Sequence, residues 1–164
     1  MKSMTKIMMA SVVAVVALAA GCQTTPNANT PAPVTQPITS TALQAYNWQL
    51  VDAKSTGGEK IAPLFYDPAK PLTLNFMMDN DNKLVSLINT CNNMGAGYSV
   101  VNGDVKLGPV RSTMMACPEP QTNFDNAALK TVEGKYSISK NANNVPVLTI
   151  TNANQVAHFK AVAK

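Results

Sequence analysis

The chain has 164 residues, 13% of them charged, and a formal net charge of +4. Lys2 and Lys6 lie in a segment that we expect to be removed, which leaves 11 basic and 9 acidic residues, a net charge of +2. The remaining basic residues occur singly, without the stripe or arginine cluster that nucleic-acid-binding domains carry. Nucleic acid is therefore excluded as a partner.

Residues 1–21 are predicted to be a lipoprotein signal peptide. The uncharged apolar run Ile7–Ala20 follows the two N-terminal lysines and is too short to span a bilayer, which needs about 20 residues. Small residues then precede Cys22, as at a signal cleavage site. The ending Gly21-Cys22 resembles the lipobox of bacterial lipoproteins, whose cysteine receives the lipid. An ordinary secretory signal with an incidental cysteine is the alternative.

The residues around Cys22 also predict where the protein lies. By resemblance to lipoprotein sorting rules, Gln23 directly after the cysteine favours the outer membrane, with the folded domain facing the periplasm. Residues 22–41 are predicted to be a flexible tether, because they contain four prolines among Thr, Asn, Ala and Gln and show no apolar periodicity. A tether of this composition reaches roughly 25–60 Å.

Residues 42–164 are predicted to form one domain with one hydrophobic core, since about 120 residues suffice for that. Short strand patterns separated by turn residues predict an antiparallel sandwich or barrel. The predicted strands cover residues 46–51, 72–77, 83–88, 98–101, 104–107, 135–140, 145–151 and 156–162. Residues 54–71 contain two adjacent glycines and several prolines and are predicted to be a loop.

Asparagine and aspartate mark the turns between these strands. Asn102-Gly103 is a strong hairpin signal, because a type I′ turn needs positive φ at both positions. Asp79-Asn80-Asp81-Asn82 is predicted to be a hairpin turn. It also resembles the start of a calcium loop, but it lacks the glycine at position 6 and the glutamate at position 12 of such loops.

One helix is predicted, near residues 118–133. Phe124, Ala128 and Val132 form an apolar stripe at i, i+4 and i+8. Thr122 and Asp125 are spaced as a capping pair, and a proline at 118 or 120 is compatible with an earlier first turn. Gly134 is placed to end the helix.

Cys91 and Cys117 are predicted to form a disulfide, because Cys22 is consumed by the lipid and the compartment is oxidising. In the chain-entropy model this bond stabilises the fold by roughly 3.5 kcal/mol. The alternatives are a reduced structural pair, a redox pair and a metal site. The spacing is far from C-x-x-C, and no other cysteine remains for zinc.

Taken in order, these features resemble the META domain family, which includes a bacterial heat-shock lipoprotein. The resemblance spans about residues 45–162 and rests on Trp48 in an early strand, the pair Cys91-Asn92 followed by Tyr98, and the box Thr113-Met114-Met115-Ala116-Cys117. The family usually has glycine where this chain has Ala96, so we expect a rearranged turn between Gly95 and Gly97.

The resemblance implies a mainly β (α+β) fold, a compact antiparallel barrel-like sheet with one packed helix. It implies no catalytic activity that can be transferred residue by residue. We interpret Asn92, Tyr98, Thr113 and Met115 as parts of the fold around the disulfide. A candidate binding surface lies where the Asn92–Gly97 segment meets the connection that carries Arg111, with Asn93, Met94 and Gly95 on its other side.

The sequence offers little for catalysis. His158 is the only histidine, and neither paired carboxylates nor a nucleophile motif accompany it. Five methionines between residues 77 and 115 suggest a copper site, but methionine more often fills gaps in a core. We therefore expect no enzymatic activity, no cofactor and no metal.

We predict a monomeric, non-enzymatic outer-membrane lipoprotein for envelope stress tolerance or upkeep. It would be held to the membrane by its N-terminal lipid and would act by binding an envelope protein or peptide. The alternative is a carrier that holds a lipid or another small apolar ligand inside the barrel. An apolar internal cavity of about 300 Å³ or more would favour the carrier.

Overall fold

The computed structural model describes residues 35–164. The predicted signal peptide, the lipidated Cys22 and most of the tether lie outside the described residues. The elements in chain order are β1 (Thr35–Gln36), α1 (Ser40–Gln44), β2 (Asn47–Ser55), the 3-10 helix η1 (Ala62–Phe65), β3 (Thr73–Asp79), β4 (Asn82–Ile88), β5 (Met94–Val101), β6 (Asp104–Leu107), β7 (Arg111–Ser112), α2 (Glu119–Val132), β8 (Lys135–Lys140), β9 (Pro146–Thr151) and β10 (Gln155–Val162).

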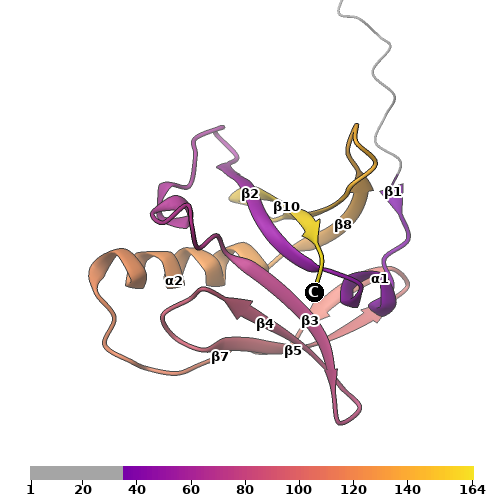
Figure 1. Ribbon diagram of the computed structural model, residues 1–164, viewed down its shortest axis with the longest axis horizontal. Helices are drawn as coiled ribbons and strands as arrows, with labels where there is room; N and C mark the ends of the chain where they lie inside the picture. The colour runs from indigo at the N-terminus through magenta and orange to yellow at the C-terminus, as the bar shows by residue number, and fades with distance from the viewer. Residues whose placement is uncertain (1–34) are drawn as a thin grey trace, which may run out of the picture. The chain divides into compact units, whose positions relative to one another are not determined.

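The ten strands form one antiparallel sheet in the order β1-β8-β9-β10-β2-β3-β4-β5-β6, and β7 pairs with β5 (Figure 1). This confirms the predicted mainly antiparallel fold with one principal helix. The sheet is not closed, however: β6 and β8 come near each other without forming a ladder within the described residues. The sheet is therefore barrel-like but is not a barrel joined all round by hydrogen bonds.

Alternation along the strands decides which face is buried. Trp48, Leu74, Leu87 and Met94 are neighbours across β2, β3, β4 and β5, and all four are buried. The neighbouring row across the same strands faces the other side and is polar or glycine: Asn47, Asn75, Ser86 and Gly95. Burial of one face fixes the register, because a slip by one residue would expose the entire apolar row.

Helix α2 packs against η1 and β10 and buries the predicted stripe of Phe124, Ala128 and Val132. Its end is held from outside the helix: Asn152 Nδ2 donates hydrogen bonds to the main-chain oxygens of Lys130 and Glu133 at 3.0 and 2.8 Å. These bonds satisfy carbonyls that the last helical turn leaves without partners. The following Gly134 has φ of +143°, and a Cβ there would lie 2.4 Å from Thr151 O, so only glycine fits.

The start of the domain lies earlier than predicted. Thr35 and Gln36, assigned to the tether, pair with Ser139 and Ile138 of β8. Ile38 is buried, and Thr39 caps α1 by accepting a hydrogen bond from Ala42 N at 3.0 Å. The prediction of a tether up to residue 41 was thus wrong for its last seven residues. A two-residue strand and a five-residue helix are too short to produce a periodic pattern.

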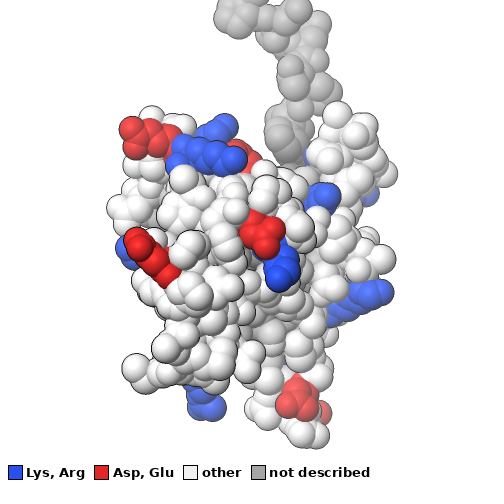
Figure 2. All heavy atoms as spheres, turned by 60° about the vertical axis from the view of Figure 1, so that its left-hand side comes forward, with Lys and Arg blue, Asp and Glu red and all other residues white. Residues whose placement is uncertain are grey.

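Charged residues are scattered over the surface. On the face shown in Figure 2, acidic and basic side chains lie in small mixed groups among uncharged ones. No helix among residues 35–164 is long and apolar enough to cross a membrane.

The buried Tyr136 gives a test of the packing between α2 and β8. Its hydroxyl donates to Val132 O at 2.5 Å, and burial raises the pKa of Tyr136 above its usual value of about 10. The stability that the neutral phenol contributes is therefore complete below about pH 10 and is lost as the pH rises through the raised pKa.

We expect Tyr136→Phe to lower the free energy of unfolding by about 1 kcal/mol near neutral pH. Urea unfolding at about pH 8 and about pH 11 should show the difference between wild type and variant shrinking at the higher pH. A difference that does not change with pH would show that the phenol does not titrate differently in the folded protein.

Candidate functional site

The two cysteines bracket the candidate site. Cys91 follows β4 and Cys117 precedes α2, and they are bonded to each other with their Cα atoms 6.3 Å apart. The predicted disulfide is therefore confirmed. It joins the connection between β4 and β5 to the segment that leads from β7 into the helix.

Asn92 is the centre of a hydrogen-bond network beside the disulfide. Its Oδ1 accepts from Thr113 Oγ1 at 3.1 Å and from Met115 N at 2.7 Å. Its Nδ2 donates to Asp125 Oδ2 at 3.1 Å and contacts Cys117 Sγ at 3.3 Å. One amide side chain thus holds the Thr113–Cys117 segment and α2 together beside the disulfide.

Asp125 is the partner that the sequence did not reveal. It is only 3% exposed, and its two carboxylate oxygens accept from the main-chain N–H groups of Cys91 and Asn92, each at 2.9 Å. The predicted capping role of Asp125 was therefore wrong. The helix begins after Pro118 without a side-chain cap, and Thr122 Oγ1 donates back to Cys117 O. One sequence signal for this role exists: Asp125 lies three residues before Ala128, so helical periodicity puts it on the buried face of α2.

The other residues of the predicted motifs pack in the core or contribute main-chain contacts. Trp48 is fully buried and donates from Nε1 to Leu43 O. The hydroxyl of the buried Tyr98 accepts from Gln44 Nε2, and its ring packs edge-on against Phe76. Met115 contributes only its main-chain N–H to the network, since its side chain is exposed, and Ala116 is exposed too.

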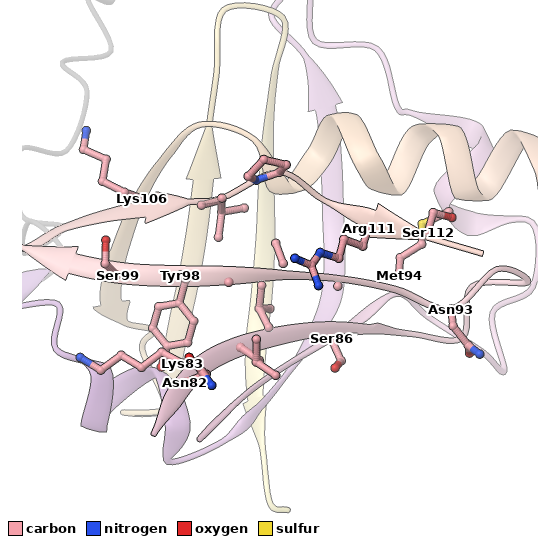
Figure 3. A pocket seen from close by; sticks show the side chains of 18 of the residues that line it. Asn82, Lys83, Ser86, Asn93, Met94, Tyr98, Ser99, Lys106, Arg111 and Ser112 are labelled. Carbon is pink, nitrogen blue, oxygen red and sulfur yellow. The ribbon is translucent and has the colours of Figure 1, made fainter. Parts of the chain in front are cut away.

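The predicted binding residues come together in a groove. Asn93, Met94, Gly95 and Arg111 all line an open surface groove of about 1400 Å³ that runs along β5 between β4 and the β6–β7 segment (Figure 3). They do not form a loop, however: Met94 and Gly95 belong to β5 and pair with Ser112 and Arg111 of β7. The rearranged turn expected around Ala96 is absent, since β5 is a regular strand with Ala96 buried.

The floor of the groove is formed largely by main chain. Gly95 and Gly97 occupy the outward positions of β5, where other residues would place side chains. A Cβ on Gly97 would have no neighbour nearer than Lys83 O at 3.9 Å, whereas a Cβ on Gly95 would lie 2.9 Å from Val85 O. Gly97 therefore leaves open space, and Gly95 permits the close approach of β4.

The groove is positively charged. Its lining contains Lys83, Lys106 and Arg111 against one acidic residue, Asp81. Arg111 is the only arginine of the chain, and its side chain extends over β5 in Figure 3, while Lys83 and Lys106 lie toward the far end. Arg111 was a predicted binding residue, but neither lysine was. The register places Lys106 on the same face as Arg111, because their partners Ser99 and Gly95 share a face of β5. Lys83 instead shares its face of β4 with the buried Val85 and lines the groove from the start of that strand.

The comparisons with known proteins agree with this architecture. The family model for the META domain matches residues 41–164. The chain belongs to the META domain family. Comparison with curated proteins finds no match.

Two solved structures share the fold of this META domain. One is an NMR structure of a protein from Burkholderia xenovorans, with a TM-score of 0.65 and 21% sequence identity to this chain. The aligned region covers 85% of this chain and 97% of that protein. A second NMR structure has a TM-score of 0.50 and 22% sequence identity to this chain. The aligned region covers 76% of this chain and 95% of that protein. At such identities the likeness concerns the fold alone.

The histidine, the methionines and the Asp79–Asn82 turn considered in the sequence do not form a common site. His158 Nδ1 lies 3.9 Å from Asp52 Oδ2, and the two side chains are 41% and 39% exposed, respectively. Met94 is buried while Met114 is 98% exposed. Asp79–Asn82 forms the predicted hairpin turn, with positive φ at Asn80 and Asp81. Among residues 35–164 there is no group of three or more His, Cys, Asp or Glu side chains placed to hold a metal.

The two glycines of β5 give a matched test of the groove floor. We expect Gly95→Ala to lower the free energy of unfolding by about 1–3 kcal/mol, because the new Cβ forces β4 and β5 apart. Gly97→Ala should be neutral or should stabilise by up to about 1 kcal/mol, since the space is open and alanine restricts the unfolded chain. Urea denaturation measures both, and equal effects would contradict this packing.

Proposed function

We propose that this META domain is a non-enzymatic, outer-membrane-anchored lipoprotein that supports envelope stress tolerance or upkeep by binding a protein or peptide in the β5 groove. The observation that carries the proposal is the groove itself: a main-chain floor lined by three cations and a single acid. A strand surface of this kind accepts an extended peptide, and fixed cations give the contact specificity.

We propose that the protein has no enzymatic activity because the polar side chains beside the disulfide already hold the fold together. Asn92, Thr113 and Asp125, the polar residues at the disulfide, are engaged in hydrogen bonds that hold the fold together. A catalytic base or nucleophile must instead be aimed at substrate. The cations of the groove have no nucleophile or base motif beside them, so they favour binding over chemistry.

The carrier alternative receives no support from the described residues. The inner side of the sheet is filled by Trp48, Phe76, Phe124 and Phe159, each at most 1% exposed. The groove is open to solvent and runs along β5. A ligand there would contact glycines and cations, which suits a polar partner more than a lipid tail.

The location and the stress role rest on the sequence. Cys22 in a lipobox-like ending, followed by Gln23, supports lipid attachment and outer-membrane sorting. The tether that the sequence predicts between Cys22 and β1 would give the groove access to periplasmic partners at some tens of ångströms from the membrane.

Site-specific photo-crosslinking in cells tests the proposal. A crosslinking amino acid is placed at Ser99, which lines the groove, or at Thr151, an exposed residue of β9 outside it. In a strain deleted for the gene and complemented with these variants, we expect a discrete protein adduct from Ser99 and none from Thr151. The wild-type gene should restore resistance to heat and hydrophobic antibiotics, and Arg111→Glu should restore it poorly.

Equal adducts from both positions, or none from Ser99, would contradict binding in the groove. A deletion strain as resistant as its parent would contradict the role in envelope stress.

A further inference from the structure

We propose that the groove selects an extended peptide with two acidic side chains four residues apart, one for Arg111 and one for Lys106. This inference rests on the proposed function and specifies the chemistry of its partner. It follows from the sheet register, from the open floor at Gly97 and from the edge of β5 that β4 leaves unpaired beyond Gly97.

The register sets the spacing of the two cations. Arg111 is the cross-strand partner of Gly95, and Lys106 is the cross-strand partner of Ser99. Gly95 and Ser99 are four residues apart on one strand, so they share a face at a separation of about 13 Å. In an extended peptide laid along β5, side chains i and i+4 also share a face at about 13 Å. Acidic residues at those two positions therefore match both cations at once.

The position between the two acids lies over Gly97. This glycine is an outward residue of β5, and nothing approaches its missing Cβ more closely than 3.9 Å. The groove therefore has room at its middle for the side chain i+2 of the same peptide. A β-branched side chain added at position 97 would occupy that room while remaining compatible with a strand.

The far end of β5 offers main-chain hydrogen bonds. The β4–β5 ladder ends at the pair Leu84 and Gly97, whereas β5 continues to Val101. Gly97 O accepts a hydrogen bond from Gly108 N, so the polar main-chain groups of Gly97 point toward β6. Because these groups point to opposite edges in successive residues of a strand, the N–H and C=O of Val100 point to the edge where β4 has ended. Residues 98–101 pair with β6 on their other edge, but on this edge no strand among residues 35–164 pairs with them. The main chain of the last residues of the peptide, beyond the one that lies over Gly97, can therefore hydrogen-bond to this edge.

The charge around this end favours an acidic partner over a basic one. Lys83 lies on the β4 side of the widening gap and Lys106 on the β6 side, as Figure 3 shows. Asp81 is the one acidic residue in the lining and lies at the tip of the β3–β4 hairpin. A basic peptide would meet three like charges and one opposite charge, and therefore would be repelled.

Fluorescence anisotropy with purified protein and labelled eight-residue peptides tests this inference. Three probes share one Thr/Val background and differ only in two positions: two glutamates four residues apart, two adjacent glutamates, or two lysines four residues apart. We expect the first probe to bind at least about 3-fold more tightly than the second, and the third not to bind. Binding of the first probe should weaken as salt is raised.

Variants of the protein identify the contacts. Arg111→Ala and Lys106→Ala should each weaken binding of the first probe about 3- to 10-fold, and Gly97→Val should abolish it by filling the floor. Lys135→Ala, on the outer side of β8 and outside the groove lining, is the charge control and should change nothing. Melting temperatures and NMR spectra of all variants verify that each is folded.

The possible failures are distinguishable. Equal binding of the two glutamate probes would overturn the four-residue spacing, and unchanged affinity in both Arg111→Ala and Lys106→Ala would overturn the assignment of the cations. Absence of binding by all three probes, together with a Ser99 adduct in cells, would reject the acidic peptide while the proposed function stands. Absence of both binding and adduct would reject the two proposals together.

Discussion

Two hydrogen bonds between Asn92 and Asp125, one from the main-chain N–H and one from the side-chain amide, hold together parts of the chain that are 33 residues apart in sequence. The same carboxylate binds two main-chain N–H groups at the start of the β4–β5 connection, and the same amide binds the segment after β7. A buried carboxylate is costly unless its oxygens accept hydrogen bonds. Removing the Asp125 carboxylate would leave the N–H groups of Cys91 and Asn92 without this acceptor, so the carboxylate holds the β4–β5 connection to α2.

This network and the disulfide act on the same place. Both fix the connection before β5 to the segment after β7, and between them β5 pairs with Arg111 and Ser112. One end of the groove is therefore fixed by covalent and hydrogen-bonded contacts, while its other end widens where β4 and β5 separate beyond Gly97. A rigid end combined with an open end suits a surface that receives an extended segment.

The sequence predicted those features that depend on local pattern. Alternating apolar residues located most of the strands, the i, i+4, i+8 stripe located α2, and Asn102-Gly103 located the β5–β6 hairpin. The disulfide followed from the cysteine count and the expected compartment. Each of these signals depends on residues close together in the chain or on chemistry that needs no three-dimensional information.

The missed features depend on tertiary contact. The stretch Met94–Gly97 contains two glycines and lacks strand propensity, yet it forms regular β structure because β4 and β7 pair with its two edges. Asp125 has its buried role only because the Cys91 connection passes beside α2. The cationic groove requires the register that brings Lys106 and Arg111 to one face of β5, with Lys83 nearby at the start of β4, and no sequence pattern contains that register.

The most direct measurement of the central claim is amide hydrogen exchange in Asp125→Asn, well below its melting temperature. The replacement keeps the shape of the side chain but turns one acceptor oxygen into a donor. We predict that exchange accelerates at least about 10-fold over residues 91–97 and 111–115 while the amides of β8, β9 and β10 keep their protection. Acceleration spread evenly over the whole sheet, or none near Asn92, would contradict the claim that this contact holds the groove.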